Sequence, residues 1–184
     1  MSSPYILPAP LESILYDLQQ SIKAGLYYPA LLVALTIPEI CITLGLDKNV
    51  FVKEKHYSAF IDKYTTPPTL GLSGVDCYRL RCGIVHRANL AGHPHFGATH
   101  VIFTVPNTGH SLHAFSINHG EKIASMFDLK TFCDAMDNAV RKWFKDNEKN
   151  ATVISNLKDL ISYRPFGAPP FFSGAPVVAS GPES

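Results

Sequence analysis

A continuous apolar stretch at residues 27–46 limits the folds open to this chain more than any other feature. It is about as long as a helix that crosses a membrane. Pro38 and Glu39 interrupt it, and the sequence on either side is that of an ordinary globular domain. We therefore expect a buried central helix at residues 29–44, because a helix that is apolar nearly all round must be covered on several sides. Pro38 should kink this helix and Gly45 should end it.

The composition fits one domain that is followed by a tail. The chain has 184 residues, of which 46% are hydrophobic and 17% charged, and its formal net charge is +1. We assign residues 1–163 to the domain and 164–184, rich in Pro, Gly, Ala and Ser, to a flexible tail in which Phe171 and Phe172 could dock on a partner. The low net charge excludes bulk electrostatic attraction to nucleic acid or to an anionic membrane, so any such contact must be local.

Cysteine usage and the N-terminal sequence favour a cytoplasmic protein. The four cysteines form no CxxC pair and lie in apolar stretches, where a thiol packs as a small hydrophobe. The N-terminus lacks the basic and apolar regions of a secretory signal. A reduced compartment fits these features better than a disulfide framework does.

Apolar residues recur at helical spacing in several other segments, which predicts a mainly α fold. Further helices are expected at residues 11–26 and 50–64, from Ser73 to about 89–92, from Asp128 onward and at 151–162. Ser73 and Asp128 are suited to cap their helices, because their side-chain oxygens accept hydrogen bonds from unpaired amides. Two predicted core-facing sets are Phe51, Tyr57, Phe60, Ile61 and Tyr64 in the helix ended by Pro67 and Pro68, and Leu129, Phe132, Cys133, Met136, Val140 and Trp143 in the last long helix.

The spacing of apolar residues changes after residue 98 from the helical period to the alternation of a strand. Residues 99–105 alternate as a strand does, with Val101, Phe103 and Val105 on one side. The segment Pro-Asn-Thr-Gly at 106–109 has turn chemistry, and residues 110–117 are expected to return as a second strand. The fold class is therefore a bundle of four to five helices with an inserted β-hairpin at about 99–117.

Residues 78–86, Tyr-Arg-Leu-Arg-Cys-Gly-Ile-Val-His, place arginine and histidine on one helix. Arg79 precedes His86 by seven positions and Arg81 precedes it by five. On an ideal helix Arg79 lies about 20° from His86 and Arg81 about 140° from it. Arg81 would reach His86 only through its long side chain, a bend near Gly83 or a second subunit.

This pair suits phosphate chemistry. Arginine holds a phosphate with a planar fork of donors, and histidine can give or take a proton near neutral pH. RNA cleavage by the 2′-hydroxyl requires phosphate binding and proton transfer, and it requires no metal. The structural alternative is that these side chains solvate a helix face or pair with a carboxylate. Glu39 must find such a partner in its apolar helix, and Arg79 or Arg81 is a candidate.

The nine-residue segment resembles the R-x4–6-H signature of the HEPN superfamily. The surrounding layout, over about residues 11–145, is similar to that of small bacterial HEPN-like proteins. The resemblance implies a HEPN-like helical bundle and a homodimer in which two Arg/His helices face each other. Catalytic members are metal-independent ribonucleases of toxin–antitoxin, phage-defence and RNA-processing systems. Others bind nucleotides or serve as non-catalytic partners.

Carried over by position, the resemblance makes Arg81 and His86 the catalytic residues, with no cofactor. Arg79 also satisfies the spacing, and Arg79, Arg87 and Asn89 are the expected substrate-binding residues. Cys82 stands where the ribonucleases usually have a polar residue, and a thiol is a poor orienting group. RNA or a nucleotide, an antitoxin or another protein, and a second copy of the chain are the expected partners; a membrane is not.

The many histidines allow one further interpretation. Seven of the eight lie between His86 and His119. His93 and His95 could join His86 and His100 around a metal, but a structural zinc site needs four ligands at defined spacing, and neither CxxC nor HExxH occurs. We expect instead a polar loop near the rim of the site, with His110, His113 and His119 as strand residues. The sequence also lacks a P-loop, a Rossmann glycine pattern and a hydrolase elbow.

Overall fold

The computed structural model describes residues 6–66, 70–90, 98–106, 109 and 112–181. In these ranges the fold is mainly α, as predicted, with six helices and a small mixed sheet. The helices are α1 (Ala9–Lys23), α2 (Tyr27–Leu44), α3 (Glu54–Tyr64), α5 (Gly74–Arg87), α6 (Leu129–Asn147) and α7 (Ala151–Asn156), which continues into a 3-10 turn, η1 (Leu157–Asp159). The three-stranded sheet holds β1 (His100–Thr104), β2 (Phe115–His119) and β3 (Lys122–Asp128).

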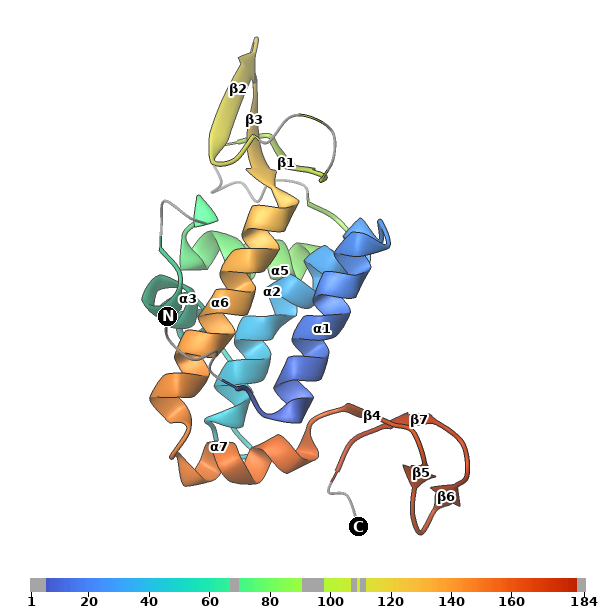
Figure 1. Cartoon of the computed structure of the whole chain (residues 1–184). Coiled ribbons are helices and arrows are strands. Elements are labelled where there is room, and N and C mark those ends of the chain that lie inside the picture. Colours follow the sequence, from blue (N-terminus) through green and yellow to red (C-terminus); the bar gives the residue numbers. More distant parts are fainter. Residues whose placement is uncertain (1–5, 67–69, 91–97, 107–108, 110–111, 182–184) are drawn as a thin grey trace.

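The helix α2 lies at the centre of the bundle, as the sequence predicted. It packs against α1, α3, α5 and α6, and Figure 1 shows it between α1 and α6. Leu35 and Ile37 are buried, and the Tyr57 hydroxyl of α3 donates a hydrogen bond of 2.7 Å to the Leu35 carbonyl. By length and composition α2 also qualifies as a membrane span. Because α1, α3, α5 and α6 pack against α2, burial in the bundle also explains its apolar composition.

The helix α3 begins later than the sequence indicated. Residues 50–53 precede it, and Phe51, predicted to face the core, is 85% exposed. The cause is a capping box at Lys53, whose amide donates to Nδ1 of His56. The other four predicted core residues of this helix are buried. Pro67 and Pro68 lie outside the described residues, and the helix ends before them at Tyr64.

Both predicted helix caps are confirmed. Ser73 Oγ accepts the Asp76 amide at 3.2 Å, and Asp128 Oδ1 accepts the Thr131 amide at 2.7 Å. All six predicted core-facing residues of α6 are buried. The Ser73 cap sets where α5, the Arg/His helix, begins, and the Asp128 cap sets where α6 begins.

The predicted hairpin at 99–117 is wrong, because its two strands, β1 and β2, do not pair with each other. The strand β1 pairs with β3 in parallel, with Ile102 opposite Met126, and the tight hairpin instead joins β2 to β3. Its two-residue connection, Gly120-Glu121, has glycine at φ +62°, which matches the backbone that short hairpin loops need. The alternation of residues 99–105 identified a strand but contained no information about its partner.

The sheet is attached to the bundle through aromatic residues on one face. Val101 and Phe127 are buried there, and the Phe103 ring lies 5.7 Å from Phe127 and 5.4 Å from Phe132 of α6. The hairpin of β2 and β3 projects from this end of the bundle (Figure 1).

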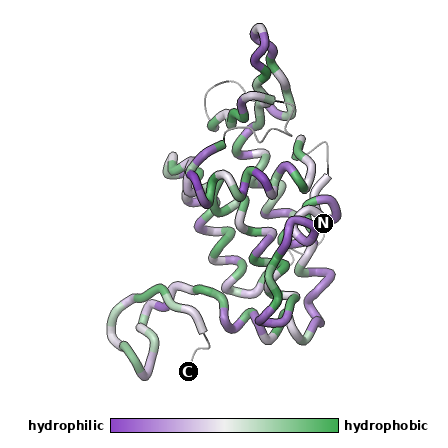
Figure 2. The backbone as a smooth tube through the Cα atoms, turned by 180° about the vertical axis from the view of Figure 1, so that it is seen from behind, coloured by the Kyte–Doolittle hydropathy of each residue, from purple (hydrophilic) through white to green (hydrophobic). Residues whose placement is uncertain are grey.

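The segment predicted as a tail contains short paired strands. β4 (Ser162–Arg164) pairs with β7 (Val177–Ala179), and β5 (Gly167–Ala168) pairs with β6 (Phe172–Ser173). This segment lies beside the opposite end of the bundle, and much of it is hydrophobic (Figures 1 and 2). Phe171 and Phe172, predicted to dock on a partner, are 92% and 50% exposed. Their docking on a partner stays a prediction.

Three of the four cysteines are buried, and this makes stability sensitive to alkaline pH. Burial raises the pKa of Cys133 from 9.0 to about 12, and it raises the pKa values of Cys41 and Cys77 as well. An unfolded thiol loses its proton near pH 9, whereas the folded one keeps it. The stabilising contribution is therefore complete below pH 9 and is lost as the pH rises toward 12.

We expect the free energy of unfolding to fall above pH 9 by at most about 1.4 kcal/mol per pH unit for each buried thiol. Urea unfolding of the wild type and of Cys133→Ala over this range measures the effect, and the variant should lose stability less steeply with pH. Cys82→Ala removes the half-buried thiol and serves as the control. Equal slopes for the wild type and Cys133→Ala would contradict the prediction.

Candidate active site on helix α5

The helix α5 is held against α2 and α3 by one buried face. Cys77, Leu80 and Ile84 are buried on that face. Gly74 allows the closest approach, since a Cβ there would lie 2.4 Å from the Ser58 carbonyl oxygen of α3. Arg79 and His86 lie away from that face, whereas Arg81 lies at its edge, beside α2, and is only 17% exposed.

Arg81 and His86 meet within one chain. Arg81 Nη1 lies 3.4 Å from His86 Nε2, and His86 is exposed. Because a guanidinium only donates, His86 accepts with Nε2 and carries its proton on Nδ1 in this arrangement. Of the three routes that the sequence left open for Arg81 to reach His86, the structure shows the first, the reach of the long arginine side chain. A second subunit is not needed to bring them together.

Arg81 also forms an ion pair with Glu39 of α2, as the sequence predicted for one of the two arginines. Arg81 Nη2 contacts Glu39 Oε2, and the two side chains are only 17% and 32% exposed. Within the described part of the chain, Arg81 Nε is buried without a hydrogen-bond partner. The guanidinium therefore has Nη2 on a carboxylate and Nη1 on His86, while its Nε–H group has no partner among the described residues.

The remaining predicted substrate-binding residues are arranged differently. Arg79 lies 3.9 Å from Asp76 Oδ1, one turn earlier on α5, instead of joining His86. Arg87 and Asn89 are exposed at the C-terminal end of the helix. The positive charge of Arg87 in this last turn suits the helix dipole.

The end of α5 is closed by a left-handed residue. Ala88 has φ +49°, and the amides of Ala88 and Asn89 donate to the carbonyls of Ile84 and Gly83 at 3.2 Å each. A Cβ on Gly83 would lie 2.5 Å from the Asn89 carbonyl oxygen. Gly83 therefore permits the turn that ends the helix directly after His86 and Arg87.

We expect Gly83→Ala to destabilise the protein by about 1–3 kcal/mol, because backbone must move to admit the methyl group. Chemical denaturation measures the change. Gly45→Ala is the matched control, since a Cβ at Gly45 meets only the Ile42 carbonyl oxygen at 3.5 Å, an ordinary contact. A loss for Gly83→Ala no larger than for Gly45→Ala would contradict this account of the helix end.

Tyr78 belongs to the same cluster, although sequence reasoning assigned it no role. Its hydroxyl is hydrogen-bonded to the Cys82 thiol, and its ring lies 5.5 Å from Tyr57 in an edge contact. Burial raises the pKa of Tyr78, and the nearby thiol raises it further. The spacing of Tyr78 from Arg81 and Cys82, three and four residues, was the signal that could have found it. It supplies a protonated hydroxyl beside the Arg/His pair.

The other histidines are separate from this pair. Nδ1 of His113 accepts the Asp128 amide at 3.1 Å, which is a structural contact at the start of α6. His100, the first residue of β1, contacts the preceding Thr99, and His119 is exposed on β2. His93, His95 and His110 lie outside the described residues. Among the residues that the structure describes, no group of three or more His, Cys, Asp and Glu side chains is placed to hold a metal.

Comparisons leave the site to be interpreted on its own geometry. No family model, no curated protein and no solved structure matches this chain.

Proposed function

We propose that this chain is a HEPN-like RNA-cleaving protein that acts without a metal, with Arg81 and His86 as its catalytic pair. The observation that carries the proposal is the 3.4 Å contact between Arg81 Nη1 and His86 Nε2. This contact places the Arg81 guanidinium, a group suited to phosphate binding, beside the exposed imidazole of His86 on the same helix. Arg87, exposed one residue later, adds a second cation for the RNA backbone.

In the proposed reaction, Arg81 binds the scissile phosphate and His86 acts as the base. When Arg81 turns from His86 to the phosphate, the lone pair of His86 Nε2 takes the proton of the 2′-hydroxyl. The 2′-oxygen then forms a bond to phosphorus, and the bond from phosphorus to the 5′-oxygen breaks. The products are a 2′,3′-cyclic phosphate and a 5′-hydroxyl, whose proton comes from water or from His86 of a second copy. Arg81 stabilises the charge that builds on the phosphate oxygens.

A homodimer across α5 is part of this proposal, by resemblance to the HEPN superfamily. Two copies of His86 facing each other would supply both a base and an acid. We further propose a cytoplasmic setting and a toxin or phage-defence role, in which the activity would be controlled by an antitoxin or another protein.

The test is incubation of the purified protein with end-labelled RNA in EDTA. We expect fragments that end in 2′,3′-cyclic phosphate. The absence of cleavage at protein excess over a range of RNA sequences would overturn the proposed activity. Expression in a bacterial host should arrest growth, and His86→Ala should relieve that arrest.

A non-catalytic module that binds RNA, a nucleotide or a protein partner is the second candidate. Two observations favour it: Glu39 already occupies one edge of Arg81, and the residue after Arg81 is Cys82, which contacts Tyr78. This candidate predicts that fluorescent RNA binds, as measured by anisotropy, and stays intact in the same tubes. Binding weakened by Arg81→Met without any cleavage would decide in its favour.

A further inference from the structure

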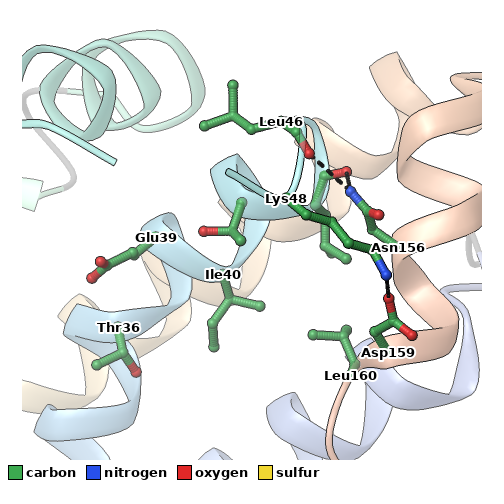
Figure 3. A pocket seen from close by; sticks show the side chains of 10 residues that line it. Thr36, Glu39, Ile40, Leu46, Lys48, Asn156, Asp159 and Leu160 are labelled. Atoms are coloured by element: carbon green, nitrogen blue, oxygen red, sulfur yellow. Dashed lines mark hydrogen bonds and ion pairs between the residues drawn. The ribbon is translucent and has the colours of Figure 1, made fainter. Parts of the chain in front are cut away.

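A pocket of about 390 Å³ lies against the C-terminal half of α2, and nothing in the proposed function uses it. It is formed by α2, the connection that follows α2, and the α7–η1 segment (Figure 3). Its volume is within the range of small-molecule sites. The lining residues are Thr36, Glu39, Ile40, Thr43, Leu44, Leu46, Lys48, Asn156, Asp159 and Leu160.

The far wall of the pocket is held in place by Asn156. Its amide nitrogen donates to the Leu44 carbonyl at 3.1 Å and to the Leu46 carbonyl at 3.0 Å (Figure 3). Both amide hydrogens are thereby used, so only the Oδ1 acceptor remains for a guest. Beside it Lys48 Nζ is paired with Asp159 Oδ2 at 2.7 Å. This end of the pocket is therefore already built, with its one cation engaged.

Thr36 and Glu39 lie together at the other end of the pocket (Figure 3). The Thr36 hydroxyl donates to the Val33 carbonyl at 2.9 Å, so it too presents lone pairs to a guest. Glu39 adds a carboxylate that is 32% exposed and whose Oε2 contacts Arg81, so a guest must share this carboxylate with the guanidinium. Between the two ends the walls are apolar, from Ile40, Leu44, Leu46 and Leu160.

We propose that this pocket binds a small apolar amine, with the ammonium against Glu39 and Thr36 and the hydrocarbon body along Ile40 and Leu160. An ammonium group offers three donors and no acceptor, which complements the acceptors at this end of the pocket, the Thr36 hydroxyl lone pairs and the Glu39 carboxylate. A carboxylic acid of the same shape would meet the charges of Glu39 and Asp159. A neutral alcohol would gain the apolar contact but not the charge-assisted hydrogen bond, which is about twice as strong as a neutral one.

The experiment is isothermal titration of the full chain with 2-phenylethylammonium, 2-phenylethanol and 3-phenylpropanoate. We expect the amine to bind at least about tenfold more tightly than the alcohol, which corresponds to one charge-assisted bond, and the acid to bind least. Thr43→Trp fills the pocket from an exposed position and should abolish binding of the amine. No binding of the amine, equal binding of all three probes, or unchanged binding to Thr43→Trp would overturn the proposal.

A second variant tests the placement of the ammonium. Glu39→Gln keeps the size of the side chain and removes its charge, and should lower the affinity for the amine while leaving that for the alcohol unchanged. Glu12→Gln, on α1 and away from the pocket lining, is the control and should change neither. A failure to observe RNA cleavage would not affect these results, because the titration measures only the binding of the three probes to the pocket.

Discussion

His86→Ala is expected to reduce the RNA cleavage rate about 10²–10⁴-fold, the usual contribution of one general acid–base group. The imidazole is exposed, and its known contact is with Arg81, so its removal should leave the fold and the free energy of unfolding nearly unchanged. Single-turnover cleavage of a labelled RNA in EDTA measures the loss. A rate within about threefold of the wild type would exclude His86 as the base.

His119→Ala is the matched control for that measurement. His119 is also an exposed histidine, but it lies on β2 and not on α5. Its replacement should leave cleavage unchanged. Arg79→Ala makes the companion comparison with Arg81→Ala, since Arg79 is paired with Asp76 and Arg81 contacts His86. The larger loss of activity should follow removal of Arg81; the reverse order would assign the motif arginine to Arg79.

Glu39→Met is expected to destabilise the protein by about 3 kcal/mol, the lower end of the range for breaking a buried ion pair, because the pair is partly exposed. The loss arises because Arg81 is left without its carboxylate while its Nε is already buried and unbonded among the described residues. Urea unfolding of Glu39→Met, of Arg81→Met and of the double variant completes a thermodynamic cycle. The double variant should cost less than the sum of the two single ones, since it leaves no unpaired charge.

Lys130→Met provides the control for this cycle. Lys130 pairs with Asp134 one turn along α6, with the two side chains 55% and 39% exposed. Surface pairs of this kind contribute little, so this replacement should change stability much less than Glu39→Met does. Additive effects of Glu39→Met and Arg81→Met would show that the two side chains act independently and would contradict the importance of their contact.

Helices were predictable from this sequence because their signals are local. The caps at Ser73 and Asp128 lie within three residues of the amides that they bind. The core face of α6 follows from apolar spacing alone. Phe51 was misplaced because one capping contact, between Lys53 and His56, competes with the apolar pattern and starts α3 later.

The sheet and the site depended on information that the sequence pattern does not contain. Alternation identifies a strand, but the pairing of β1 with β3 joins residues more than twenty positions apart, such as Val101 and Ser125. Helix angles placed Arg81 away from His86, whereas the actual contact depends on the reach of a flexible side chain that is anchored by Glu39. The need of Glu39 for a cation was predictable, because an unpaired carboxylate in an apolar helix is costly.

The position of Glu39 links two surfaces of the molecule. Its carboxylate contacts Arg81 on α5, and the same residue lines the pocket beside Ile40. The amine proposed for the pocket would donate hydrogen bonds to this carboxylate and so weaken its hold on Arg81, and an anion that draws Arg81 away would leave the carboxylate more available to the pocket. Thermodynamic reciprocity requires that each ligand change the affinity for the other by the same factor. If both proposed sites bind their ligands, this single side chain would couple occupancy of the pocket to phosphate binding on α5 without any movement of the helices.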